Sequence, residues 1–207
     1  MLRLERPGLD LSRGEHLPPH VYLREFRDRR WAAEGRDCWK LERAQSFQEP
    51  SNDSWQAFSR GEWDTARRLI EETRDKLAEL GRTSHRHHSH FLRVRVVEKP
   101  LTPYLLWELN SLRVRAELLG RIRVVGPEQL YGVESEEPLP EIVTLGGHTL
   151  YRILYDGEGL FEGAVRVTDP ATVARWEGFI GNLYGAGEEL ETYFAREVAD
   201  LSPPPPE

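Results

Sequence analysis

The most constraining feature of this sequence is a strand, a helix and a second strand that follow one another in the middle of the chain. Residues 91–98 alternate between apolar and polar side chains, which is the period of a β-strand with two different faces. Residues 103–120 repeat apolar residues at helical spacing, with Pro103 near the first turn and Gly120 just past the end. Residues 121–125 are again typical of a strand. A chain with this succession needs a sheet whose faces are covered by helices.

The segments before this unit have the same mixed order. Residues 20–35 predict a short helix that follows an irregular arm, and residues 38–47 predict a strand. A helical region is expected over residues 55–80. Gly61 is expected to break this region into two pieces, and Gly81 is expected to end it.

The second half of the chain adds a meander and two helices. Residues 126–140 form a long acidic stretch that predicts a loop, and residues 141–168 predict three strands with a DGEG turn between the last two. Asp169 and Pro170 suit the N-cap and first position of a helix, and a last helix follows. The sequence therefore predicts an α+β or α/β single domain, with a mixed β-sheet covered by helices and two helices at the C-terminus.

Length and composition fit one domain with an arm and a tail. The chain has 207 residues, of which 39% are hydrophobic, and this is enough to bury a core. We expect residues 1–35 to form an N-terminal arm with the short helix, residues 36–200 the domain, and residues 201–207 a disordered Pro-rich tail. The single cysteine, Cys38, fits a reducing compartment, and no apolar run suits a signal peptide or a membrane span. The expected location is the cytoplasm, without membrane contact.

The charges are distributed unevenly along the chain. Residues 51–125 hold fourteen basic and ten acidic residues, whereas residues 126–207 hold four basic and sixteen acidic ones. Two explanations stay open: opposite charges pair across one fold, or they steer a charged partner or hold two copies together as a homodimer. Several of the basic residues are expected on neighbouring strands, where they would form a phosphate-binding face if exposed: Arg93, Arg95, Arg121 and Arg123. No helix-turn-helix, zinc-finger or RNA-binding signature accompanies them, so direct binding of nucleic acid is disfavoured.

Four of the seven histidines lie within six residues, and they raise the question of a metal site. If the following strand extends back to His87, His88 and His90 share a face with Leu92 and could chelate one ion. The third ligand could be His85, or one of the distant histidines His148, His16 and His20. No HExxH or CxxC signature supports them, and serines and an arginine interleave with them. A surface loop is the favoured interpretation, and no metal or other cofactor is predicted.

Charged side chains also stand among apolar ones, where burial would require that they be paired. One interpretation is a network of arginines and glutamates that braces the sheet against a helix. The other is a pocket for a small polar ligand, floored by aromatic rings. The residues concerned are the candidates for binding a ligand or partner: Arg43, Glu49, Arg95, Glu98, Tyr104, Trp107 and Glu108.

A family resemblance is carried by four runs: WKLERAQSFQEP, SWQAFSRGEWDTARRLI, RVRVVEKPLTPYLLWELNSLRVRAELLGRIRVV and VRVTDPATVARWEGFIGNLYGAGEELETYFA. With them, residues 36–196 resemble an uncharacterised actinobacterial family, domain of unknown function 6879. The resemblance implies a cytoplasmic protein, similar to those encoded near small helix-turn-helix regulators, and it implies no activity. The histidine run is not part of the shared pattern, which further disfavours a metal site.

The C-terminal half is also faintly similar to the phospholipase D-like sensor domains of some helix-turn-helix regulators. This likeness is carried by GRIRVV, EIVTLGGHTLYRILYD and GAVRVTDPATVARWEGFIGNLYGAGEEL. Active phospholipase D enzymes need the motif H-x-K-x4-D, and this chain has no H-x-K, since Leu150 stands two residues after His148. The likeness therefore implies a regulatory or binding module that lacks this catalytic motif.

Together these observations predict a regulatory or interaction protein that binds a protein partner, such as a helix-turn-helix regulator, or a small effector. No catalytic residue is assigned, so an enzyme is the less favoured class. The alternative is a hydrolase acting on a phosphorylated or anionic substrate, which the basic middle of the chain, the histidines and the acidic loop suggest. A nucleic-acid-binding module ranks third.

Overall fold

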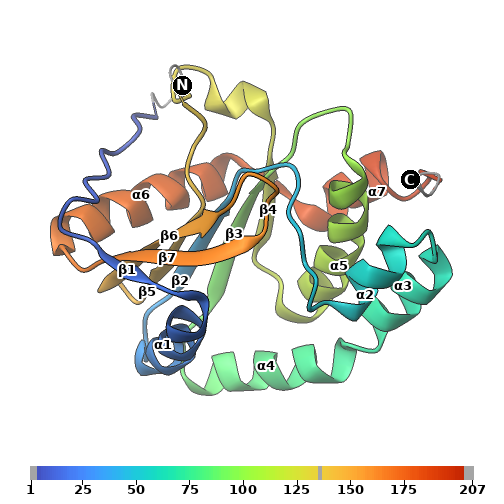
Figure 1. The fold of residues 1–207 in the computed structure, drawn as a ribbon, viewed down its shortest axis with the longest axis horizontal. Helices are drawn as coiled ribbons and strands as arrows, with labels where there is room; N and C mark the ends of the chain where they lie inside the picture. The colour runs from blue at the N-terminus through green and yellow to red at the C-terminus, as the bar shows by residue number, and fades with distance from the viewer. Residues whose placement is uncertain (1–3, 135–136, 203–207) are drawn as a thin grey trace.

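A mixed β-sheet runs through the centre of the molecule (Figure 1). The computed structural model describes residues 4–134 and 137–202, and within them the sheet has eight strands in the order β1-β7-β6-β5-β2-β3-β4-β8. Strands β2, β3 and β4 are parallel to one another, and the other neighbours are antiparallel. The strands are β1 (Glu15–Leu17), β2 (Cys38–Glu42), β3 (Phe91–Val96), β4 (Ile122–Val125), β5 (Ile142–Leu145), β6 (Thr149–Tyr155), β7 (Phe161–Val167) and β8 (Glu188–Glu189). The predicted single domain with a mixed sheet is confirmed.

The helices connect and cover these strands. Three of them lie in the crossover from β2 to β3, and α5 forms the crossover from β3 to β4, as parallel neighbours require. Two helices close the chain, as the sequence predicts. The helices are α1 (Pro19–Ala32), α2 (Asp53–Ser59), α3 (Trp63–Glu71), α4 (Arg74–Arg86), α5 (Pro103–Leu119), α6 (Pro170–Ala186) and α7 (Leu190–Glu197), with one 3-10 turn, η1 (Pro127–Leu130).

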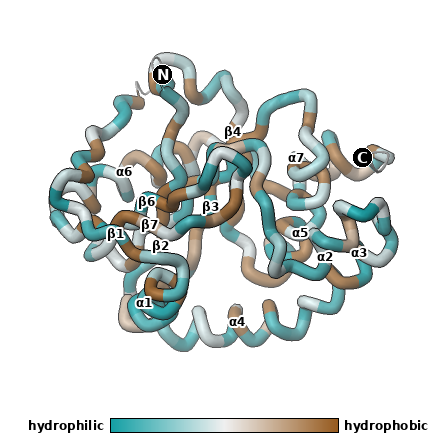
Figure 2. Tube along the Cα trace, viewed as in Figure 1, coloured by the Kyte–Doolittle hydropathy of each residue, from teal (hydrophilic) through white to brown (hydrophobic). Residues whose placement is uncertain are grey.

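Strand alternation gives the sheet two chemically different faces. Leu41 of β2 and Val94 of β3 lie side by side on one face, where they pack with Trp176 of α6. Their neighbours Lys40 and Arg93 are paired in register and lie on the opposite face. Figure 2 shows the hydrophobic residues gathered along the strands, while the outer turns of α1 and α4 are hydrophilic. The α6 face is thus a closed apolar layer, whereas the opposite face carries charges.

That opposite face is covered in separate pieces. Helix α1 packs on β5, β6 and β7, and α5 packs on β4 together with α7. Helix α4 contacts α5 and runs along the lower edge of the view from α1 toward α5 (Figure 1). On this face, the middle strands β2 and β3 therefore lie between α1 and α5 and have no helix packed directly on them.

Helix α4 corrects the prediction that Gly81 ends the helical region. The break at Gly61 is confirmed, with φ of +75°, but a second break at Glu72 and Thr73 divides the expected long piece into α3 and α4. Helix α4 then continues through Gly81 to Arg86. A Cβ atom at position 81 would lie 3.1 Å from Leu119 of α5, so the glycine allows the two helices to approach closely. Glycine within a helix costs about 1 kcal/mol relative to alanine, whereas any larger residue here would have to displace the Leu119 side chain.

The continuation of α4 also changes the setting of the histidines. His85 lies within α4, His87 is its C-cap, and His88 has a left-handed backbone with φ of 47°. Strand β3 begins only at Phe91, so the condition under which His88 and His90 would share a strand face is not met. Basic residues interact favourably with the dipole at the C-terminal end of a helix. His85 and Arg86 lie in the last turn of α4, which fits this preference.

The arm, the acidic loop and the tail complete the chain. The N-terminal arm contributes β1, which pairs with β7 at the edge of the sheet. The loop between β4 and β5 buries Leu130, Val133 and Leu139 in the layer formed with α6. From residue 203 onward, the tail predicted to be disordered lies outside the described residues. No helix in the described part of the chain has both the length and the apolar character of a membrane span.

Candidate functional site

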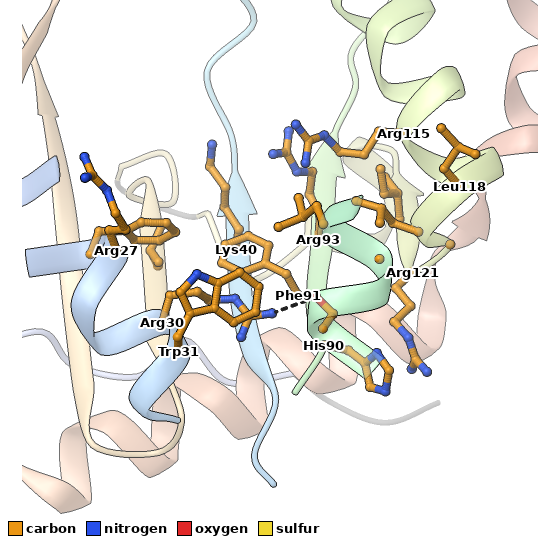
Figure 3. A pocket seen from close by; sticks show the side chains of 18 of the residues that line it. Arg27, Arg30, Trp31, Lys40, His90, Phe91, Arg93, Arg115, Leu118 and Arg121 are labelled. Carbon is orange, nitrogen blue, oxygen red and sulfur yellow. Dashed lines mark hydrogen bonds between the residues drawn. The ribbon is translucent and has the colours of Figure 1, made fainter. Parts of the chain in front are cut away.

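A cavity of about 860 Å³ lies over the middle of the sheet, in the gap between α1 and α5 (Figure 3). Helix α4 contributes to its wall, and β2 and β3 contribute to its floor. This volume lies within the range of roughly 300–1,000 Å³ that is usual for small-molecule sites. The cavity is therefore the candidate functional site of the fold.

The cavity lining is strongly basic. Two of its residues are histidines, His85 and His90, and neither aspartate nor glutamate lines it. The chain as a whole has 35 acidic and 28 basic residues. The cavity lining is therefore positively charged in a protein whose net charge is negative. The lysine and arginine side chains that line the cavity come from four different elements and the turn after α5: Arg27, Arg30, Lys40, Arg93, Arg115 and Arg121.

Two cations on the floor share one carboxylate beneath them. Lys40 of β2 pairs with Glu42 Oε1, and Arg93 Nη1 of β3 lies 2.9 Å from Glu42 Oε2. Burial alone would raise the pKa of Glu42, but Arg93, Lys40 and Arg95 together lower it to about 2. Glu42 is thus ionised at neutral pH, and its single negative charge compensates only one of the two positive charges that pair with it.

Arg115 adds a third cation from the opposite wall. It lies one helical turn before the end of α5 and reaches toward Arg93 (Figure 3). Burial, and then the charge of Arg93, lower the pKa of Arg115 to about 10. A lowered pKa in an arginine means that the fold offers its positive charge too little compensation.

Arg30 is a fourth cation, and the fold fixes its position. Its Nη1 atom donates to Ser89 Oγ at 2.6 Å and its Nη2 atom donates to the Ser89 carbonyl at 2.9 Å. Its guanidinium carbon lies 4.6 Å from the ring centre of Trp31 and 5.6 Å from that of Phe91. Burial lowers the pKa of Arg30, although nearby Cys38 and Asp37 oppose this effect. Aromatic faces and a serine therefore hold this buried charge in place of a carboxylate.

The remaining basic residues lie at the mouth of the cavity. Arg27 and Arg121 are exposed, and Arg121 has a left-handed backbone with φ of 67° just after α5. Burial, and then Arg121, lower the pKa of His90, so this imidazole is held toward its neutral form. Within the described residues, several of the lining cations have no carboxylate in ion-pair distance: Arg27, Arg30, Arg115 and Arg121.

Aromatic rings form the wall nearest α1. The rings of Phe26 and Phe91 meet edge to face at 6.0 Å, and Tyr22 and Phe161 do so at 5.6 Å. Tyr155 continues this wall toward the sheet, 6.1 Å from Phe161. The cavity therefore combines positive charge with a rigid apolar surface, two features that recognise different parts of one ligand.

The residues that the sequence nominated for binding a ligand or partner lie outside the cavity lining, whereas His85 and His90 of the histidine run line it. Arg95 and Glu108 form a buried ion pair, with Nε and Oε2 separated by 2.7 Å. Arg43 bonds Glu98 at 2.6 Å and also bonds Glu134 of the acidic loop at 2.6 Å, which ties that loop to β2. These contacts brace the sheet against α5 and the loop. Binding of a ligand or partner by these residues stays a prediction.

The nominated aromatic residues are buried near α2. Tyr104 donates its hydroxyl to Glu49 at 2.8 Å, and Trp107 donates its indole N–H to Ser54 at 2.9 Å. Trp107 is only 2% exposed, so in this conformation its ring is not available to a partner. Its contacts with Trp55 and Tyr104 place it in the core formed by α2, α3, α4 and α5.

Of the basic residues that the sequence placed on neighbouring strands, Arg93 and Arg121 line the cavity. Arg95 pairs with Glu108 and Arg123 pairs with Glu189 on β8. Lys40, Arg115 and Arg30 were not among the candidates, because no local pattern distinguishes them from the other charged residues of their segments. In the described part of the chain, no three histidine, cysteine or acidic side chains gather as metal ligands would.

Comparison with known proteins shows the family to which the chain belongs. Residues 25–195 match the model of a domain of unknown function, DUF6879. The chain belongs to this family. The match covers α1 from residue 25 onward, β2 and β3, and α4 and α5, and these segments supply most of the cavity lining. No curated protein matches the chain.

Proposed function

We propose that this member of the DUF6879 family is a cytoplasmic regulatory protein that binds a small anionic molecule in the basic cavity. The observation that carries the proposal is the composition of the lining: six lysine and arginine residues and no carboxylate in a chain with a formal net charge of −7. Leaving cations together without counter-charges costs free energy in the ligand-free state. Binding of an anion would recover that energy, and this gives the cavity its specificity for negative charge.

The position of the cavity supports the regulatory part of the proposal. Its walls come from α1, α4 and α5, which are joined to each other mainly through the sheet and the α4–α5 contact. An anion held by Arg30 of α1 and Arg115 of α5 would link two helices that otherwise stand on different strands. Such a link changes the relative stability of conformations of the covering helices, and a protein partner could respond to that change.

Native mass spectrometry of the tag-free protein tests the proposal first. We expect a co-purified adduct of small-molecule mass, or, where the protein is recovered without one, a thermal stabilisation by organic anions that weakens as salt is added. Neutral analogues of the same anions serve as the control. A bare mass, together with no stabilisation by any organic anion beyond that given by sodium chloride, would exclude the proposal.

A second candidate is the hydrolysis of an anionic substrate. The observation that favours it is that His85, His90 and Ser84 line the same cavity as the cations. A histidine whose pKa is lowered, as that of His90 is, can accept a proton near neutral pH. Turnover of phosphoesters that is lost in a His90→Gln variant would support this candidate. Binding without turnover would leave the regulatory role.

A further inference from the structure

The charge on the cavity floor narrows the ligand class, and this step rests on the proposed function. Lys40, Arg93 and Arg115 bring three positive charges to one region, and the Glu42 carboxylate brings one negative charge. The side chains of Lys40 and Arg93 rise side by side from β2 and β3, and Arg115 reaches toward them from α5 (Figure 3). The excess is therefore two positive charges, which a single dianionic group would neutralise.

Two common anionic groups differ in this respect. A phosphate monoester carries about −1.5 to −2 charges at neutral pH, with a second pKa near 6. A carboxylate or a sulfate ester carries one negative charge and leaves one cation of the floor uncompensated. Two guanidinium groups and an ammonium also suit the three terminal oxygens of a phosphate, because guanidinium groups bind such oxygens two at a time.

The apolar walls of the cavity indicate which group the ligand carries besides its anionic group. Beside the floor stand Phe91 and the rings of α1, with the Arg30 guanidinium stacked between Trp31 and Phe91. On the other side, Leu118, Leu119 and Ile122 give an apolar surface. A flat ring between these surfaces would gain aromatic contacts on one side and aliphatic contacts on the other.

We infer that the ligand is a phosphate monoester of an aromatic molecule, with its phosphate between Lys40, Arg93 and Arg115 and its ring against the wall of Phe26 and Phe91. Inorganic phosphate alone would then bind weakly, because it leaves the apolar walls uncovered. A monoanionic ester of the same ring would bind weakly as well, because it leaves the floor with an excess charge.

The experiment compares 1-naphthyl phosphate, 1-naphthyl sulfate and inorganic phosphate by calorimetry with the full-length protein. At about pH 8, where the phosphate ester is dianionic, we expect the naphthyl phosphate to bind at least about tenfold more tightly than either of the others. This preference over the sulfate should decrease toward about pH 5, where both esters are monoanions. At about pH 5 the two esters carry the same charge, so the ratio of their affinities there is the internal control for the charge of the ligand.

Arg115→Gln tests the floor, and Arg113→Gln is its matched control. Arg113 lies on the same helix and pairs with Glu71 and Glu117 outside the cavity lining. We expect Arg115→Gln to weaken 1-naphthyl phosphate binding about tenfold and to abolish the preference over the sulfate, and Arg113→Gln to leave both unchanged. If Arg115→Gln fails to fold, Lys40→Gln is used in its place.

The outcomes separate this inference from the proposed function. Equal affinity for the phosphate and the sulfate at about pH 8, or an unchanged preference in a folded Arg115→Gln variant, would overturn the inference while anion binding stands. A failure of both naphthyl esters and of every other organic anion to bind would overturn the inference and the proposed function together.

Discussion

Glu42 and Glu141 are both buried, yet their surroundings shift their pKa values in opposite directions. Glu42 has three basic neighbours, and these lower its pKa to about 2 in spite of burial. Burial, and then the charge of Glu42, raise the pKa of Glu141 to about 7, although the backbone N–H groups of Ala44 and Arg43 donate to Oε1 and oppose this effect. The second oxygen of Glu141, Oε2, has no hydrogen-bond partner in the described structure. One carboxyl therefore balances cations, whereas the other is tolerated best in its neutral form.

The raised pKa of Glu141 predicts a pH-dependent stability. A carboxyl whose folded pKa lies above its unfolded value binds more protons in the folded state, so stability decreases as pH rises from about 4.5 to about 7. The full effect is on the order of 3 kcal/mol. Glu141→Gln mimics the neutral acid, so the variant should not lose stability in this way as pH rises. We expect the variant to gain stability relative to the wild type between about pH 5 and pH 8 in urea unfolding.

Glu158→Gln is the matched control, since Glu158 is exposed in the turn between β6 and β7. Its stability difference from the wild type should stay nearly constant over the same pH range. A Glu141→Gln variant that is equally destabilised at both ends of the range would show that Glu141 is ionised and favourably placed in the fold.

At the scale of elements, the sequence predicted those whose signals are local. Helix α5 was predicted almost to the residue, because Pro103 and Gly120 mark its ends and Thr102 is a good N-cap. The end of α4 was not predicted correctly. Gly81 allows close contact with Leu119 of α5, and a contact between two helices leaves no signal in the local sequence. Strands β1 and β8 have three and two residues, too few for alternation to be recognised.

The cavity needed information that no single segment contains. The alternation of β2 already separates Lys40 from Trp39 and Leu41, so the polarity of this face is visible in the sequence. That Lys40 faces Arg93 depends on the parallel register of β2 and β3. That Arg115 joins them depends on where α5 crosses the sheet. Sequence reasoning therefore expected Arg93 and Arg121 on neighbouring strands, but it could not bring Lys40 and Arg115 together with them.

The N-cap of α5 gives a prediction at this scale. Thr102 Oγ1 accepts a hydrogen bond from Leu105 N at 3.1 Å and donates one to the Gln45 carbonyl, so it joins the helix start to the segment after β2. Thr102→Ala should lower the free energy of unfolding by about 1–2 kcal/mol. Thr102→Ser keeps the hydroxyl and should lose less than half as much. Urea unfolding of both variants measures the difference, and equal losses would assign the effect to the methyl group instead.

Across the whole molecule, opposite charges mostly meet within one fold. The acidic C-terminal third supplies Glu134 to Arg43 and Glu189 to Arg123, which supports the first of the two explanations for the uneven charge. The cavity is the exception, since Arg115 and Arg30 find no acidic partner in the described chain. A molecule that pairs most of its charges and leaves a group of like charges in a cavity retains a site for an external anion.

This arrangement predicts that binding and ligand-free stability oppose each other at Arg115. Its lowered pKa shows that the positive charge is unfavourable in the ligand-free fold, with burial and Arg93 as the causes. Arg115→Gln removes that charge, so the ligand-free variant should be more stable than the wild type by about 1–2 kcal/mol, after allowance for solvent screening. Added 1-naphthyl phosphate should stabilise the wild type, by about 2.7 kcal/mol at a hundred times its Kd, and should stabilise the variant much less. Urea unfolding with and without the ester measures both effects, with Arg113→Gln as the charge-matched control. A ligand-free Arg115→Gln variant that is clearly less stable than the wild type would show that Arg115 serves the fold rather than an anion.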